Sequence, residues 1–417
     1  MEKEGPPYDP LGVRMCGARG RENKKGSQKP KGFAGEISKG EKAMKTGKFL
    51  LVLLCAALVS AMVLPVNTHA AEYEYYFRGL KISSETPLAP DYLYSVVSGP
   101  VEYVYLDFNP PAPDTRLYVT LSGNAENVKL SVDGRVDITL ENLTMTGESK
   151  AIDLGGGFNG SLLLKGSNTL ISSGENPALN IYHGAHASIR QATGEPAFLL
   201  AKGGPVNPGI RVGRHTNADG TVIYGMLEIW SGTVTAMSGV EGSGGTGGAG
   251  IGGLNGESGG VINIHGGVVT AIGDKSAGIG GGNRSANGGK ITINGGTVIA
   301  VGGNEGAGIG GGDDDSDGGE ITISGGFVTA VGGSLAAGIG GGNNGTSGVI
   351  TITGGTVIAN GGGGGAGIGG GNHNNNEGGN VNSIQIHGGV IFASGKDGGE
   401  DIGRGNGATE EIGAVAI

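Results

Sequence analysis

The chain has 417 residues, of which 93 are glycine, and its formal net charge is −10. Residues 1–70 hold 12 of the 28 Lys and Arg residues and 6 of the 38 Asp and Glu residues, which leaves a net charge of about −16 for the rest. Such an acidic protein is a poor match for nucleic acid or an anionic membrane surface. Both cysteines, Cys16 and Cys55, lie in this first segment, so we expect no disulfide, thiolate metal site or thiol catalysis after it.

The first 70 residues divide into two parts. Residues 1–43 are basic and rich in Pro and Gly, which predicts a disordered leader or a start assigned too early. Residues 44–70 predict a secretory signal peptide, because a charged start precedes an apolar run of 16 residues, Phe49 to Leu64. We expect cleavage after Ala70 and a secreted protein. Only an uncleaved segment would hold it to a membrane or cell surface, and the run is shorter than the ~20 residues of a spanning helix.

Residues 71–114 are rich in tyrosine, and alternation around Val101 indicates a strand. We predict an N-terminal cap here, because the first coil of a stacked repeat leaves an open strand edge. The alternative is that the tyrosines form a patch that stacks on sugar rings. They are Tyr73, Tyr75, Tyr76, Tyr92, Tyr94, Tyr103 and Tyr105.

The remainder of the chain repeats one unit. Residues 241–407 contain glycine-rich copies such as GGKITINGGTVIAVGGNEGAGIGGG at 288–312, and residues 115–240 carry a less glycine-rich version. Each copy contains three short apolar runs with the alternation of strands, separated by turns. Residues 408–417 form a short acidic tail. The third run recurs at Ile152, Leu179, Ile210, Ile251, Ile279, Ile309, Ile339, Ile368 and Ile402.

This periodicity predicts an all-β fold, a single-stranded right-handed parallel β-helix of about nine coils. A flexible glycine-rich linker would not keep Ile and Val in register through five copies, and a β-propeller blade needs a longer repeat. With coils stacked at about 4.8 Å, Ile291 should lie against Ile321 and Ile350 in an internal ladder.

Outward positions of the third strand are candidate binding residues. They are Asp153, Asn180 and Arg211 in the early coils and glycines at Gly252, Gly280, Gly310 and Gly340 afterwards. Glycine at these positions either allows close approach of a flat ligand or relieves crowding at a sharp corner.

The only tryptophan, Trp230, lies near an insertion that contains Tyr224. An exposed indole beside a tyrosine could stack on a sugar face. The alternative is that the indole fills the corner under the insertion.

One loop of the repeats is strongly acidic, with Asp313, Asp314, Asp315 and Asp317. Four carboxylates so close repel one another unless a cation separates them, so we expect a Ca²⁺ site or a solvated acidic turn. We assign no catalytic residue. Arg284 and Lys290, one coil earlier, are the only bases that a Ca²⁺-dependent lyase could use near this loop.

The signature ITI, GGxVxA and GAGIGGG resembles the tandem units of a family of secreted Gram-positive bacterial proteins described as carbohydrate-binding, over about residues 115–407. The resemblance implies a fold similar to pectate lyases, binding of cellulose-like or acidic polysaccharide, and calcium. The prediction is therefore a secreted, monomeric, non-catalytic protein that binds plant-type or acidic polysaccharide with possible help from Ca²⁺. The alternatives are a Ca²⁺-dependent polysaccharide lyase and a structural or adhesive surface rod.

Overall fold

The computed structural model describes residues 73–109, 115–240, 247–284, 286–373, 379–408 and 414–417. The predicted leader, the signal segment and residues 409–413 of the acidic tail lie outside these residues. Strands and turns without any helix make up the described part of the chain. Consequently it contains no helix that could cross a membrane.

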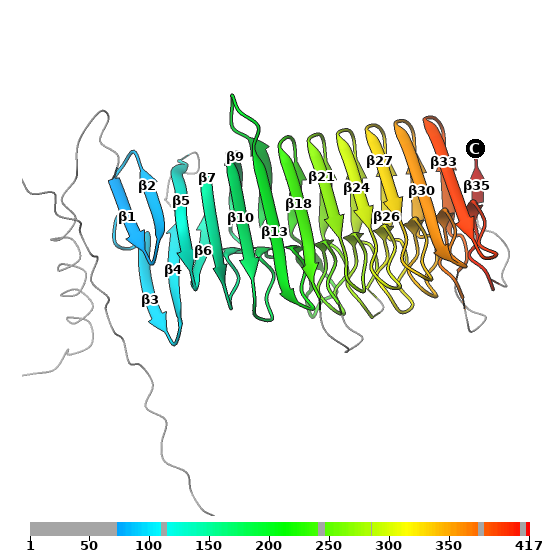
Figure 1. Ribbon diagram of the computed structural model, residues 1–417, viewed down its shortest axis with the longest axis horizontal. Coiled ribbons are helices and arrows are strands. Elements are labelled where there is room, and N and C mark those ends of the chain that lie inside the picture. The colour runs from blue at the N-terminus through cyan, green and yellow to red at the C-terminus, as the bar shows by residue number, and fades with distance from the viewer. Residues whose placement is uncertain (1–72, 110–114, 241–246, 285, 374–378, 409–413) are drawn as a thin grey trace, which may run out of the picture.

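The described residues form a rod of stacked coils, with the chain advancing along the long axis (Figure 1). Three ladders of parallel strands run the length of this rod. The first ladder contains β9 (Asn159–Lys165), β12 (His186–Gln191), β17 (Met226–Ile229), β20 (Val261–Ile264), β23 (Lys290–Ile293), β26 (Glu320–Ile323), β29 (Val349–Ile352), β32 (Ser383–Ile386) and β35 (Ala414–Ala416).

The second ladder contains β10 (Ser167–Ser172), β13 (Phe198–Pro205), β18 (Thr233–Gly239), β21 (Val268–Ile272), β24 (Thr297–Val301), β27 (Phe327–Val331), β30 (Thr356–Gly363) and β33 (Val390–Lys396). The long strand β7 (Val136–Gly147) pairs with β9 through one half and with β10 through the other. It therefore begins both ladders after β5 (Leu117–Glu126).

The third ladder contains the nine strands that the recurring third run predicts. They are β8 (Ile152–Leu154), β11 (Leu179–Ile181), β14 (Ile210–Val212), β19 (Ile251–Gly252), β22 (Ile279–Gly280), β25 (Ile309–Gly310), β28 (Ile339–Gly340), β31 (Ile368–Gly369) and β34 (Ile402–Gly403). Two more parallel strands precede them, β4 (Val101–Phe108) and β6 (Val128–Gly134). The ladder thus extends into the tyrosine-rich segment.

The core consists of columns of equivalent apolar residues. Ile291 pairs with Ile321, which pairs with Ile350, and all three are at most 1% exposed. The predicted internal ladder and the parallel β-helix are confirmed. Each such side chain contributes on the order of 1.5–3 kcal/mol on burial, and no coil could bury its apolar face without its neighbours.

Antiparallel strands lie outside the first parallel coil. They are β1 (Tyr73–Phe77), β2 (Leu80–Ser84) and β3 (Leu93–Ser98). β2 pairs with β5, and β3 pairs with β4, so both strands of the first coil have partners on each edge. Pairing of this kind removes an open edge on which other chains could aggregate. The insertion after β14 forms a hairpin of β15 (Arg214–Thr216) and β16 (Val222–Tyr224).

Candidate functional site

The structure brings three predicted site residues together on the third ladder. Asp153, Asn180 and Arg211 occupy one register position on β8, β11 and β14. The Asn180 amide donates to the Asp153 carboxylate, and Nη1 of Arg211 donates to Oδ1 of Asn180 at 2.9 Å. These side chains form a continuous polar row along the rod.

Ion pairs close the polar row at both ends. Lys129 and Lys150 contact Oδ2 of Asp153 at 2.8 and 3.3 Å. Burial alone would raise the pKa of the Asp153 carboxyl, but the hydrogen bond from Lys129 and the charge of Lys150 hold it below its usual value.

At the far end, the Arg211 guanidinium binds Glu257 through Nε at 2.8 Å and Nη2 at 2.7 Å. The charged and polar groups of the row therefore have partners within the protein, and their contacts join successive coils.

The glycines that continue this row meet a packing requirement. Gly280 and Gly310 have φ angles of +139° and +134°, a region that L-residues rarely adopt. A Cβ atom on Gly310 would lie 2.1 Å from the carbonyl oxygen of Gly340 in the next coil. The structure thus favours the explanation by crowding over the close approach of a ligand.

The structure does not unite Trp230 with Tyr224. Tyr224 lies before β17 and Trp230 directly after it, so a four-residue strand separates them. The indole stacks on the His265 ring at 3.9 Å between centroids, and the Arg190 guanidinium lies 4.9 Å from the indole. Since these neighbours belong to the preceding and the following coil, the indole already has partners along the ladder.

Aromatic side chains gather instead at the N-terminal end of the third ladder. Tyr94 on β3 and Tyr105 on β4 stack at 4.9 Å between ring centroids with an interplanar angle of 15°. Tyr182, directly after β11, is 40% exposed and lies under the Arg211 guanidinium at 5.7 Å. Three strand spacings separate β4 from β11, roughly 14 Å along the rod.

A groove of about 360 Å³ connects these tyrosines, and we call it the tyrosine groove. Its volume falls within the range of ligand sites, about 300–1,000 Å³. Among the residues that the structure describes, three carboxylates and no basic side chain line it. The lining residues are Tyr94, Tyr105, Leu106, Asp107, Ser131, Val132, Asp133, Asp153, Gly155, Gly156 and Tyr182.

Asp107 and Asp133 were not among the predicted site residues, because Asp107 falls in the segment predicted as a cap and no outward position was assigned on the strand that contains Asp133. The signal was present: the alternation of VEYVYLDF and VKLSVDG places both aspartates on the outward side of β4 and β6. Two expectations did point to this surface: the predicted binding residue Asp153, and the alternative interpretation of Tyr94 and Tyr105 as a sugar-stacking patch.

A second depression of about 750 Å³ lies over the glycine-rich coils. Glycines provide most of its lining, with Lys396 and Asp397 as its charged residues, and it contains no aromatic side chain. The tyrosine groove offers more groups that could recognise a ligand.

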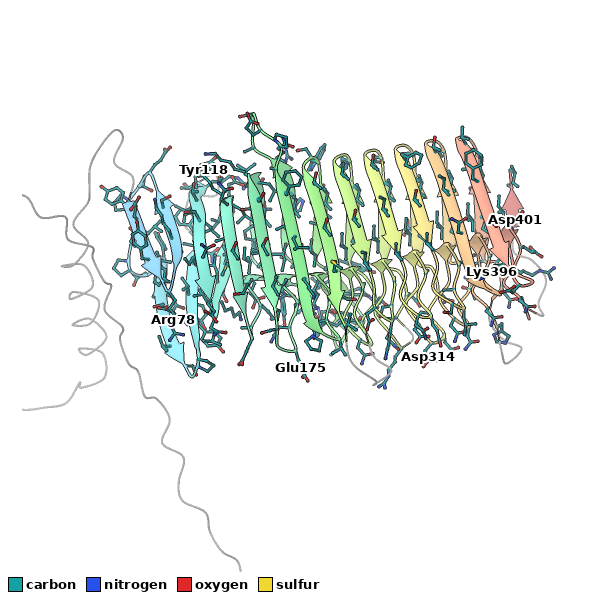
Figure 2. The ribbon with its side chains drawn as sticks, viewed as in Figure 1. Arg78, Tyr118, Glu175, Asp314, Lys396 and Asp401 are labelled. Carbon is teal, nitrogen blue, oxygen red and sulfur yellow. The ribbon has the colours of Figure 1, made fainter. Side chains whose placement is uncertain are left out.

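The aspartates of the acidic loop point to different coils. Asn283, one coil earlier, donates to Oδ2 of Asp313 at 3.3 Å, whereas Asp317 accepts from N and Oγ1 of Thr346, one coil later, at 2.8 and 2.6 Å. Asp314 lies at the loop edge of the rod (Figure 2). Asp314 and Asp315 adopt left-handed φ angles of 61° and 54°.

Among the described residues, no group of three or more His, Cys, Asp or Glu side chains could hold a metal ion. The loop therefore does not gather its four carboxylates around one point, and calcium binding there stays a prediction. Burial and the neighbouring Glu305 carboxylate raise the pKa of Asp313 to about 8.

The bases considered for a lyase do not converge with this loop. Lys290 forms an ion pair with Glu320 at 3.2 Å on the first ladder. Arg284 contacts the loop through its backbone, where its N–H donates to the carbonyl oxygen of Asp313 at 3.1 Å. No arrangement of base and bound carboxylate follows from these contacts.

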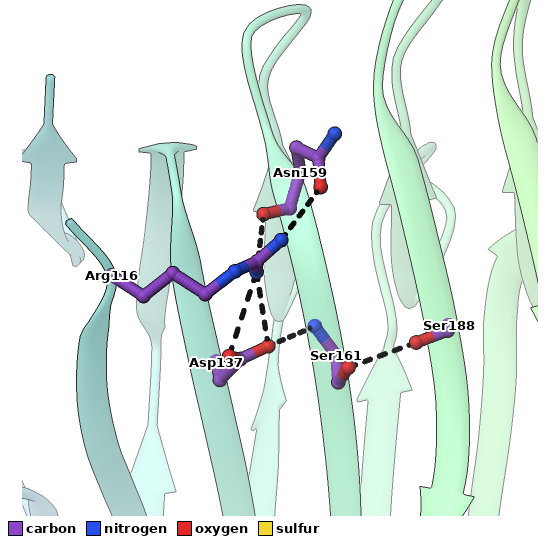
Figure 3. Close-up of polar contacts among 5 residues, drawn as sticks. All are labelled: Arg116, Asp137, Asn159, Ser161 and Ser188. Atoms are coloured by element: carbon purple, nitrogen blue, oxygen red, sulfur yellow. Dashed lines mark hydrogen bonds and ion pairs between the residues drawn. The ribbon is translucent and has the colours of Figure 1, made fainter. Parts of the chain in front are cut away.

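A further polar cluster lies on the first ladder (Figure 3). The Arg116 guanidinium contacts Asp137 at 3.4 Å and the side-chain oxygen of Asn159 at 3.2 Å. Asp137 also accepts from the Ser161 N–H at 2.8 Å, and the Ser188 hydroxyl donates to the Ser161 hydroxyl at 2.9 Å. These groups satisfy one another, so the cluster links coils in the same way as the polar row.

Four segments of the chain match the family model described as a beta helix repeat: residues 262–283, 291–313, 321–343 and 350–372. Each segment spans one first-ladder, one second-ladder and one third-ladder strand. No curated protein and no solved structure matches the chain.

Proposed function

We propose that this β-helix is a secreted, non-catalytic carbohydrate-binding protein and that the tyrosine groove is its binding site. The observation that carries the proposal is the placement of Tyr94, Tyr105 and Tyr182 around a floor of carboxylates. Aromatic rings pack against the apolar faces of sugars, and carboxylates accept hydrogen bonds from their hydroxyls. The length of the groove, roughly 14 Å from the strand spacing, fits an extended chain of sugar units.

The tyrosines would carry much of the affinity. Tyr94 is 47% exposed, so its ring can receive a ligand without rearrangement of the core. The stacked arrangement with Tyr105 limits the freedom of both rings, which reduces the entropy lost on binding.

The test uses residues 71–417, which begin after the predicted cleavage point. Retention on insoluble cellulose and on other polysaccharides is measured by pull-down and titration, for the parent and for Tyr94→Ala/Tyr105→Ala. We expect this double variant to bind about tenfold more weakly or worse. Its circular dichroism and melting temperature serve as a check on folding.

Two further variants separate the groove from other aromatic surfaces. Tyr118→Ala is the matched control, because Tyr118 is 62% exposed on β5 and does not line the groove (Figure 2). Trp230→Ala tests the site that the sequence suggested. Loss of retention in Trp230→Ala with full retention in the Tyr94/Tyr105 variant would contradict our assignment.

The same experiment tests the other functions. An unsaturated product that absorbs in the ultraviolet would support the lyase. If the protein shows neither retention nor product, the structural or adhesive rod is the best remaining function. A parallel series with a chelator tests the proposed help from Ca²⁺, because binding that depends on calcium is lost when the ion is removed.

A further inference from the structure

Two carboxylates that line the tyrosine groove have no basic partner among the described residues. Asp107 and Asp133 are register neighbours on β4 and β6, so their backbones lie about 4.8 Å apart. Neither forms an ion pair with any described residue. Asp107 accepts from the Asn109 amide at 2.7 Å, and Asp133 accepts from the Gly134 N–H at 2.9 Å.

Asp153, the third carboxylate of the groove, is different. It binds both Lys129 and Lys150, so its charge is already compensated. The uncompensated negative charge of the groove therefore lies at Asp107 and Asp133, beside the Tyr94 and Tyr105 rings.

The Asp133 carboxylate is held in place by the loop after β8. A Cβ atom on Gly157 would lie 2.6 Å from Oδ1 of Asp133, and one on Gly155 would lie 3.1 Å from its Cγ. Only glycines allow the loop to pass so closely over this side chain. The negative charge of Asp133 is thus a fixed feature of the groove.

Like charges on neighbouring register positions repel each other, and a cation between them removes the repulsion. Tyrosine rings also attract an ammonium group that lies within about 6 Å of their centroids. An acidic sugar would instead place its own carboxylate against these two. The charges of the groove therefore select among glycans.

We propose that the tyrosine groove recognises an amino-bearing glycan, whose protonated amine lies between Asp107 and Asp133 while the sugar ring packs on the tyrosines. This inference rests on the proposed function and narrows its ligand. It places acidic polysaccharides outside the specificity of the groove.

Two ligands of equal length test this directly: an oligomer of glucosamine, which carries free amines, and an oligomer of N-acetylglucosamine, in which each amine is a neutral acetamide. Calorimetric titrations at about pH 6 keep the free amine protonated. We expect the glucosamine oligomer to bind at least tenfold more tightly at low salt. The preference should shrink as sodium chloride rises, since salt screens exposed charges.

The variant Asp107→Asn/Asp133→Asn should reduce the preference to about onefold. The control variant Glu195→Gln/Glu320→Gln removes the same charge from two exposed positions outside the groove and should keep the preference. An equal loss in both variants would mean that net charge, not the groove, attracts the amine, and would overturn the proposal.

Equal binding of the two oligomers by the parent would also overturn it. Retention on cellulose that depends on Tyr94 and Tyr105, without any preference for the amine, would refute the amine site and keep the carbohydrate-binding function. Failure to bind any polysaccharide would refute both.

Discussion

The early and late coils of this β-helix use the same ladder position in opposite ways. In β8, β11 and β14 the outward position carries Asp153, Asn180 and Arg211, which bind one another from coil to coil. In the later strands the position is glycine, and the backbone of the next coil takes up the space. Polar side-chain contacts between coils therefore gather where the third-ladder strands have three residues, and they give way to glycine where the strands have two.

The largest loss of stability is expected from a substitution in the glycine row of the late coils. Gly310→Ala introduces a Cβ atom 2.1 Å from a backbone oxygen at a φ of +134°. We expect a loss of about 4 kcal/mol or more in the free energy of unfolding, measured with urea.

Gly256→Ala is its control, because Gly256 has a φ of +74° and no atom within 4 Å of an added Cβ. This variant isolates backbone strain, about 1 kcal/mol or somewhat more. Equal losses in the two variants would show that crowding between coils does not explain the glycine row.

A smaller effect is expected in the early coils. Arg211→Ala leaves the Glu257 carboxylate without its bidentate partner, and the two side chains are only 13% and 15% exposed. We expect a loss of about 3 kcal/mol by urea denaturation.

The double variant Arg211→Ala/Glu257→Ala measures the interaction between the two residues. It should lose clearly less than the sum of the two single variants. Additive losses would mean that the polar row does not act as a connected unit.

A last prediction concerns the acidic loop, and its effect depends on pH. Because burial and Glu305 raise the pKa of Asp313 to about 8, the folded protein holds a proton that the unfolded chain releases above its ordinary value of 3.8. The native state binds more protons between these values, so stability should fall as the pH rises from about 4 to about 8.

Asp313→Asn removes this titration. Relative to the parent, this variant should be more stable at pH 9 than at pH 5, as measured by urea midpoints at the two pH values. Asp315→Asn, in the same loop, is the control. A parallel pH response in the parent and in Asp313→Asn would contradict the buried position of this carboxyl.

The repeat pattern was sufficient to predict the strands and the inner ladders. Alternation identifies which side chains face inward, and the fixed period stacks Ile291 on Ile321, so both predictions depend only on local order in the chain. The predicted third-ladder residues Asp153, Asn180 and Arg211 also met, because equivalent positions of successive coils must lie side by side.

Sites that depend on the direction in which side chains point were harder to predict. Trp230 and Tyr224 are close in sequence, yet a strand carries one away from the other. Asp313 and Asp317 lie within one turn, where the backbone reverses and sends them toward different coils. The tyrosine groove joins Tyr94 to Tyr182, and this neighbourhood depends on the parallel stacking of β4, β6 and β8, which precede the regular repeats.

The tyrosine groove lies at one end of the rod, apart from the glycine-rich repeats that determine the length of the rod. Each glycine-rich coil pairs only with the coil before and the coil after it, so gain or loss of one copy lengthens or shortens the rod by about 4.8 Å. Unequal exchange between the nearly identical copies would therefore change the length of the rod without altering the end that carries the tyrosine groove. The length of the rod can therefore change by one coil at a time.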